Sequence, residues 1–345
     1  MSGIHSMSDL RGLPVSFVCG IYGYHITRPI DLPCLDLRIE PFTGDYADAK
    51  LRADNHQSYQ LTAILKGKRK STSDHFLFNL EAILSFIESR DVLITPAEEL
   101  TNEESPFSQF PESIVGTLRG KASKAAILED SFNPTARTSF IITALTRFNS
   151  EAEKLENETE KSLKIPLFNS LFFKYVESFR QNTMFPEISY YLLFSGLEAF
   201  AMSWADRVDL FKKETPEQIC EKCMQPIPNK RSYRSASYAI YKFLKKDGDV
   251  FGATDSFKAD KIDIKTKIPI KYDKYAAMAA YAELRNKLFH VNEFKGSIKK
   301  GEKETVSLDL FEYLPRLELL VQLVILKEVG FDDADINYKA WLTLQ

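Results

Sequence analysis

The stretch PEISYYLLFSGLEAFAMSWADRV, residues 186–208, decides the fold of the second half of the chain. Its opening proline suits the first turn of a helix, where the missing N–H has no helical partner to lose. Apolar side chains, among them Ile188, Leu197 and Trp204, occur on nearly every side of the predicted helix. A helix that is apolar all round belongs in the middle of a bundle. We therefore expect a helical bundle, with Glu198 as an isolated carboxylate inside it.

Three further stretches predict helices of the same bundle. Residues 166–182 and 315–329 have helical spacing, and Gly330 follows the second where a left-handed cap is expected. Residues 272–290 have an apolar stripe at helical spacing. The stripe consists of Ala277, Tyr281, Leu284 and Leu288. We predict that residues 131–345 form an all-α domain.

The first part of the chain has a different pattern. Residues 34–42 alternate apolar and charged side chains, as a half-buried strand does, and residues 14–21 and 59–65 also predict strands. Residues 79–90 have the spacing of a helix. Residues 1–130 are therefore expected to form a mixed α/β-strand domain, which makes the whole chain α+β. The basic run at 66–70 beside a strand predicts a hairpin tip.

The composition is that of a soluble globular protein, with 44% hydrophobic and 27% charged residues in 345. The net charge of −3 means that any nucleic-acid site must be a local basic patch. Residues 1–10 lack the pattern of a signal peptide, and the longest apolar stretch, 317–329, is too short and too charged to span a bilayer. We expect a cytoplasmic protein without membrane contact. Its four cysteines are expected to be reduced.

The six residues Arg285-Asn286-Lys287-Leu288-Phe289-His290 carry the clearest chemical signal. Asn286 and His290 are four apart and share a helix face, so the amide could orient the imidazole. Arg285 and His290 lie roughly 140° apart on a regular helix. Imidazole can take a proton from a 2′-hydroxyl near neutral pH, and a guanidinium can stabilise the charge that grows on a phosphate. An Arg and a His at this spacing also arise by chance, as an ordinary surface pair.

The motif resembles that of the HEPN superfamily, whose active members have Arg, then a polar residue, then His at the end of a helix (R-x4–6-H). The residues YYLLFSGLEAF at 190–200 are similar to the "YxxLxxxLEA" helix of Apea-like HEPN domains. The resemblance covers roughly residues 140–330. It implies a dimeric helical bundle that cuts RNA with Arg285 and His290, positioned by Asn286, often in phage defence or as a toxin.

The resemblance further implies cleavage to a 2′,3′-cyclic phosphate without a divalent ion or any other cofactor. RNA and a second copy of the chain are then the expected partners. The alternative is a catalytically inactive HEPN module that dimerises and binds nucleotide or protein.

Several other residues are weaker candidates. Glu198 needs a partner if it is buried, and Arg285 is the partner we expect, either as a structural ion pair or to aim the guanidinium. Tyrosines interleave with cations in residues 229–246, which suits single-stranded RNA but also an ordinary packed face. The RNA-binding candidates are Lys230, Arg231, Arg234 and Lys287. Cys220 and Cys223 have the spacing of half a zinc site, but no second half follows, so we expect no metal.

Overall fold

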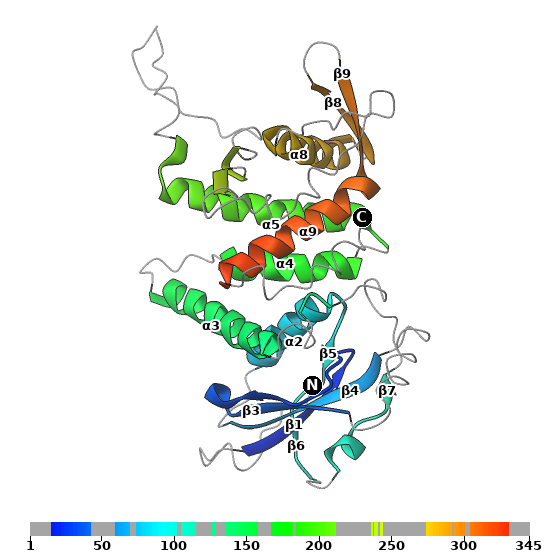
Figure 1. Cartoon of the computed structure of the whole chain (residues 1–345), viewed down its shortest axis with the longest axis vertical. Helices are drawn as coiled ribbons and strands as arrows, with labels where there is room; N and C mark the ends of the chain where they lie inside the picture. The colour runs from blue at the N-terminus through cyan, green and yellow to red at the C-terminus, as the bar shows by residue number, and fades with distance from the viewer. Residues whose placement is uncertain are drawn as a thin grey trace. The chain divides into compact units, whose positions relative to one another are not determined.

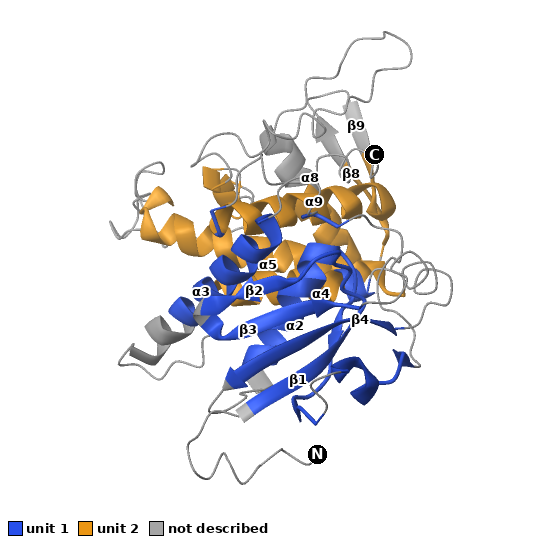
Figure 2. Ribbon diagram, turned by 60° about the horizontal axis from the view of Figure 1, so that its bottom comes forward, with its two compact units in different colours: residues 1–164, 179–183, 329–344 blue, residues 165–178, 184–328, 345 orange. Residues whose placement is uncertain are grey.

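The computed structural model describes residues 15–42, 59–69, 74–101, 105–114, 126–128, 135–157, 167–181, 184–211, 236, 238–240, 242–243, 274–291, 293–300 and 304–330. Helices and antiparallel strands occur together, so the predicted α+β class is confirmed (Figure 1). The chain divides into two compact units, coloured separately in Figure 2. Unit 1 comprises residues 1–164, 179–183 and 329–344, and unit 2 comprises residues 165–178, 184–328 and 345.

Unit 1 is built on an antiparallel sheet whose central strands follow the order β2-β3-β4-β1-β5. Two short strands extend it, since β6 pairs with β1 and β7 pairs with β4. The strands are β1 (Val15–Tyr22), β2 (Ile30–Leu32), β3 (Leu37–Pro41), β4 (Tyr59–Arg69), β5 (Leu93–Ile94), β6 (Glu98–Glu99) and β7 (Ser113–Ile114). The three predicted strands are thus confirmed, although residues 33–35 form a turn of 3-10 helix and delay the start of β3.

Apolar and charged residues alternate along β3, and their burial alternates with them, as the sequence predicts. Leu37 and Ile39 are buried on one face of the sheet, while Arg38 between them is exposed. The prediction of a hairpin tip at 66–70 is wrong, because residues 66–69 continue β4 and pair with residues 15–18 of β1. Gly67 permits this pairing, since a Cβ there would lie only 2.9 Å from the ring of Phe17.

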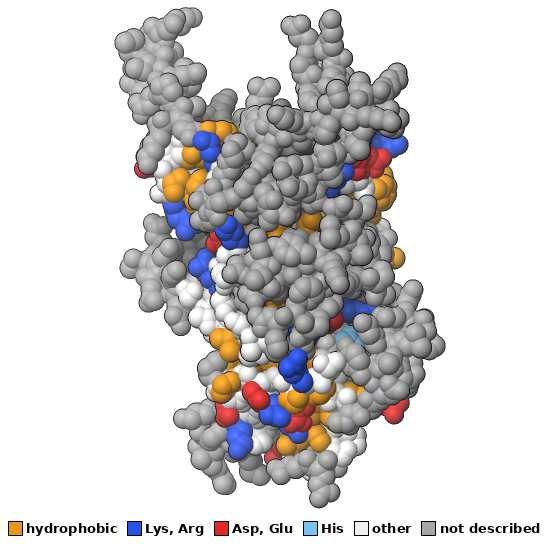
Figure 3. Space-filling model, viewed as in Figure 1, with side chains coloured by type: hydrophobic (Ala, Val, Ile, Leu, Met, Phe, Trp, Pro, Cys, Tyr) orange, Lys and Arg blue, Asp and Glu red, His pale blue; other side chains and the backbone are white. Residues whose placement is uncertain are grey.

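Charges on this sheet are paired both within β3 and across neighbouring strands. Arg38 lies 2.7 Å from Asp31 and 3.2 Å from Glu40, and Lys66 lies 2.7 Å from Glu40. In the lower part of Figure 3, basic (blue) and acidic (red) side chains of the described residues are intermixed. Lys66, the first residue of the basic run, is therefore paired with a carboxylate.

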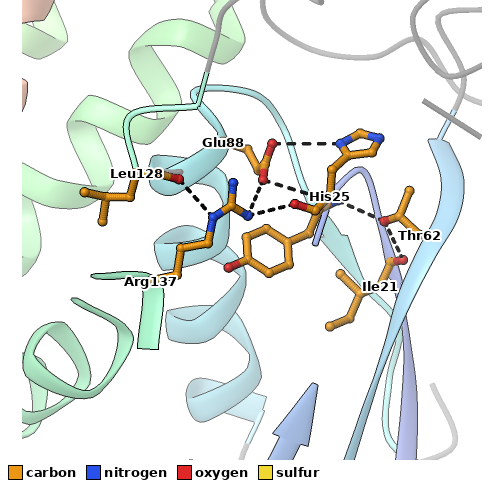
Figure 4. A network of polar contacts seen from close by, with 7 residues as sticks. Ile21, His25, Thr62, Glu88, Leu128 and Arg137 are labelled. Atoms are coloured by element: carbon orange, nitrogen blue, oxygen red, sulfur yellow. Dashed lines mark hydrogen bonds and ion pairs between the residues drawn. The ribbon is translucent and has the colours of Figure 1, made fainter. Parts of the chain in front are cut away.

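Two helices, α2 (Asp74–Glu88) and α3 (Ala136–Asn157), pack together in unit 1. Their rings of Phe86 and Phe140 stack at a centroid distance of 5.2 Å. Arg137 of α3 also donates hydrogen bonds of 2.8 Å to Glu88 of α2 and to the carbonyl of His25, which follows β1 (Figure 4). These contacts bind α3 to the sheet unit. The division between units therefore falls after residue 164, rather than near residue 130 where the sequence pattern changes.

Unit 2 contains helices from both ends of its sequence and one hairpin. They are α4 (Leu167–Gln181, its last three residues counted with unit 1), α5 (Pro186–Arg207), α8 (Lys274–Val291), β8 (Lys295–Lys300), β9 (Glu304–Asp309) and α9 (Leu310–Glu328). Helix α5 packs against α8 and α9. The hydroxyl of Tyr190 on α5 donates a 2.9 Å hydrogen bond to the carbonyl of Tyr281 on α8, and Tyr281 meets Tyr313 of α9 edge to face.

Three features of unit 2 differ from the prediction. The β8–β9 hairpin shows that this unit is not all-α. Helix α9 begins five residues before Pro315, which lies inside it. Helix α5 is not buried all round, because Ile188 and Tyr191 are 42% and 38% exposed. The left-handed cap at Gly330 is confirmed by its φ of 81°. Among the described residues, no helix combines the length and apolar character needed to span a membrane.

Candidate active site

The motif on α8 lies beside a buried stripe, as the sequence predicts. Tyr281, Leu284 and Leu288 are buried against the rest of unit 2. Arg285 and its two following residues are half-buried, whereas His290 at the end of the helix is exposed. The helix thus holds Arg285 at the margin of the core and leaves the imidazole accessible.

Arg285 is held by two neighbours. Its Nη1 donates a 3.0 Å hydrogen bond to Oδ1 of Asn286, and its Nη2 lies 3.8 Å from Oε2 of Glu198 on α5. Its Nε is buried and has no hydrogen-bond partner among the described residues. The guanidinium therefore has a preferred position, with donor capacity still free.

The contact between Glu198 and Arg285 joins the two helices that carry the family resemblance. Their side chains are 28% and 29% exposed, so the pair is less buried than an isolated carboxylate in an apolar helix suggested. The reason is the position of Glu198 around the axis of α5. Ile188, Tyr191, Ser195 and Glu198 follow one another at spacings of three or four, on the less buried face of α5.

His290 stands apart from the other two motif residues. Among the described residues, no hydrogen bond or ion pair joins it to Arg285 or Asn286. The oxygen of the Asn286 amide accepts from Arg285, so a role of this amide in orienting the imidazole stays a prediction. Within the described residues, a single copy of α8 offers a positioned cation and an exposed imidazole.

One residue near this site was missed by the sequence analysis. Lys174 of α4 extends to α5, where its Nζ donates a 3.2 Å hydrogen bond to Oγ of Ser195. Burial lowers the pKa of Lys174, and the negative charge of Glu198 acts in the opposite direction. The second effect places Lys174 within electrostatic range of Glu198. Lys174 does not stand in a motif, so only the packing of α4 on α5 reveals the contact.

The remaining candidates are placed only in part. Lys287 forms an ion pair of 3.5 Å with Glu293 and is half-buried. Phe289 packs its exposed ring against Tyr191 at a centroid distance of 4.3 Å. The RNA-binding candidates Lys230, Arg231 and Arg234, and the cysteines Cys220 and Cys223, lie outside the described residues. Within the described part of the chain, no three His, Cys, Asp or Glu side chains are grouped so that they could hold a metal ion.

Comparisons with known proteins add no relative to this picture. No protein-family model, no curated protein and no solved structure gives a significant match to the chain.

Proposed function

We propose that this protein is a metal-independent endoribonuclease of the HEPN type. The observation that carries the proposal is the Arg285 guanidinium, held between Asn286 and Glu198 with an exposed imidazole further along the same helix. Arg285 and His290 are five residues apart, which corresponds to about 7.5 Å along the helix axis. A phosphate and the ribose attached to it fit a separation of that order. The resemblance supports a role as a toxin or in phage defence.

The chemistry proposed for this arrangement is transesterification within the RNA. His290 takes the proton from a ribose 2′-hydroxyl, and the 2′-oxygen attacks the adjacent phosphorus. Arg285 stabilises the negative charge that grows on the non-bridging oxygens. The bond to the 5′-oxygen breaks, and that oxygen takes up a proton as it leaves. The products are a 2′,3′-cyclic phosphate and a 5′-hydroxyl.

The proposed active form is a homodimer. One imidazole cannot accept a proton from the 2′-hydroxyl and at the same time give one to the leaving oxygen. Two copies of α8 around a two-fold axis would supply a base, an acid and two guanidiniums. The separation of His290 from Arg285 on one helix is consistent with such a composite site.

The test uses the full-length protein with total RNA in EDTA. We expect cleavage that leaves 2′,3′-cyclic phosphate ends, detected by mass spectrometry, and its loss in His290→Ala. The matched control is Val291→Ala, which changes the next residue, an exposed side chain on the same turn of α8. This control should cleave like the wild type. Cleavage that requires a divalent ion, full activity of His290→Ala, or absence of cleavage at any protein concentration would overturn the proposal.

A further inference from the structure

Three helices bring four polar side chains together at the proposed site. Lys174 comes from α4, Ser195 and Glu198 from α5, and Arg285 from α8. Lys174 donates to Ser195, and Arg285 lies within ion-pair distance of Glu198. Ser195 and Glu198 are three residues apart, so they occupy the same face of α5. Lys174 and Arg285 therefore reach this face from two different neighbouring helices.

Gly196 makes the reach of Lys174 possible. A Cβ at this position would lie 3.1 Å from Cδ1 of Leu171 and 3.4 Å from Cδ of Lys174. The absence of a side chain therefore lets α4 approach α5 closely. The aliphatic part of Lys174 then lies across residue 196, and its ammonium group arrives beside Ser195.

The charges of this cluster do not cancel. Two cations face one carboxylate, which leaves a net charge of +1 on a half-buried surface. The hydrogen bond of Lys174 goes to a neutral hydroxyl, so the ammonium keeps two N–H donors for which no acceptor is found among the described residues. An anion with acceptor oxygens would therefore fit beside Lys174.

We propose that Lys174 binds a backbone phosphate of single-stranded RNA beside the phosphate held by Arg285. The inference rests on the proposed nuclease function and names a binding residue for its substrate. A phosphodiester carries one negative charge and two non-bridging oxygens, which can accept from the two N–H donors that Lys174 keeps. An ammonium group binds phosphate as a point charge, so the contact carries no sequence preference.

The expected effect follows from counterion release. For a single strand, each neutralised phosphate adds about 0.7 to the slope of log affinity against log salt. Between 1 M and 0.1 M salt that slope corresponds to about a fivefold change in affinity. Lys174→Gln should therefore weaken binding about fivefold at 0.1 M salt and reduce the slope by about 0.7. Lys174→Arg, which keeps the charge, should preserve the slope.

The binding experiment uses the full chain and a fluorescent 2′-O-methyl RNA, which cannot be cleaved by 2′-hydroxyl attack. Anisotropy titrations at several salt concentrations give the affinity and the slope. The charge-matched control is Lys66→Gln, which removes a half-buried lysine from β4 in unit 1. This control should keep the wild-type slope.

A second measurement does not depend on the fold of any variant. Lysine acylation of the wild-type protein, mapped by mass spectrometry, should show protection of Lys174 by the 2′-O-methyl RNA and none of Lys66. Wild-type affinity and slope in Lys174→Gln, or unchanged acylation of Lys174 with bound RNA, would overturn the inference.

The outcomes also separate this inference from the proposed function. Cleavage that depends on His290, with binding that does not depend on Lys174, refutes only the inference. Binding that depends on Lys174, without cleavage by the wild type, refutes only the nuclease. If the wild type does not bind this RNA, the inference is refuted, and the cleavage assay in EDTA decides on the nuclease.

Discussion

The ion pair between Glu88 and Arg137 should contribute much more to the stability of the folded protein than the ion pair between Glu198 and Arg285. Glu88 and Arg137 have side chains that are only 7% and 6% exposed, whereas Glu198 and Arg285 are 28% and 29% exposed. We therefore compare Glu88→Gln with Glu198→Gln. Both substitutions remove one carboxylate charge and preserve the size of the side chain.

The magnitude for Glu88 follows from its surroundings. Burial acts to raise the pKa of this carboxyl, but the charge of Arg137 and the hydrogen bond and charge of His25 outweigh it, and the pKa falls from 4.5 to about 2. A shift of this size corresponds to about 3 kcal/mol of stability. Removal of one partner from a buried pair costs on the order of 3–5 kcal/mol, because the other charge is left buried. Glu198→Gln should cost less than about 1 kcal/mol, since water screens its pair.

The pH dependence has a definite sign. The folded pKa of Glu88 lies below its unfolded value, so its contribution is complete above about pH 4.5 and is lost as the pH falls toward 2. Glu88→Gln should therefore be much less stable than the wild type at pH 7, and the difference should shrink in acid. Glu198→Gln should stay close to the wild type throughout.

Hydrogen exchange suits this comparison because it reports on each unit separately. A loss of 3 kcal/mol raises the opening equilibrium constant of the α2 and α3 amides about 150-fold, while amides of α5 and α8 should change little in Glu198→Gln. Equal effects of the two substitutions on the helices that carry them would refute the reasoning from burial.

Three further outcomes can be measured. Arg285→Lys keeps the charge but should lose most RNA cleavage in the EDTA assay. The planar guanidinium can bond Asn286, Glu198 and a phosphate at the same time, whereas an ammonium group cannot. Cleavage at the wild-type rate would contradict this. After subunit exchange with an excess of His290→Ala chains, wild-type activity should fall further than dilution predicts, whereas a monomer that cleaves at full rate would exclude a composite site. Burial and the nearby charge of Glu98 raise the pKa of the Cys19 thiol to about 12. This thiol should therefore resist iodoacetamide in the native protein at pH 8 and react after denaturation. Rapid labelling of the native protein, detected by peptide mapping, would show that β1 opens readily.

Much of the fold could be predicted because local periodicity reports which side of an element is buried. The alternation in β3 and the stripe from Tyr281 to Leu288 both describe a boundary between core and solvent, and each is found in the structure. The β8–β9 hairpin was missed because its strands are short and β8 is rich in lysine, which gives little apolar alternation there. The compact units also divide the chain at another place than the change of pattern near residue 130. Arg137 is bound to residues far away in sequence, and a change in local pattern cannot detect such a contact.

The candidate site shows the same limit at the level of single side chains. Glu198 and Arg285 could be paired from the sequence, because a carboxylate in an apolar helix needs a cation and Arg285 lies at the edge of the neighbouring apolar stripe. The depth of their burial could not be predicted, since α5 is apolar enough that several faces could meet the core. Lys174 could not be found at all. Its position depends on how closely α4 approaches at Gly196, and that distance is a property of two helices together.

Asn286 shows that two residues on the same face of a helix need not form a hydrogen bond with each other. Residues 286 and 290 do lie on one face, yet the amide oxygen accepts from Arg285, which lies one residue before it. The Asn286 oxygen restricts the guanidinium of Arg285 by this hydrogen bond. The imidazole of His290 must then be oriented by another group. In the proposed mechanism the ribose of the substrate and the second copy of α8 orient it, since no described residue is hydrogen-bonded to it. The positioned arginine and the unpositioned histidine therefore fit a site that is completed only when RNA and two subunits come together.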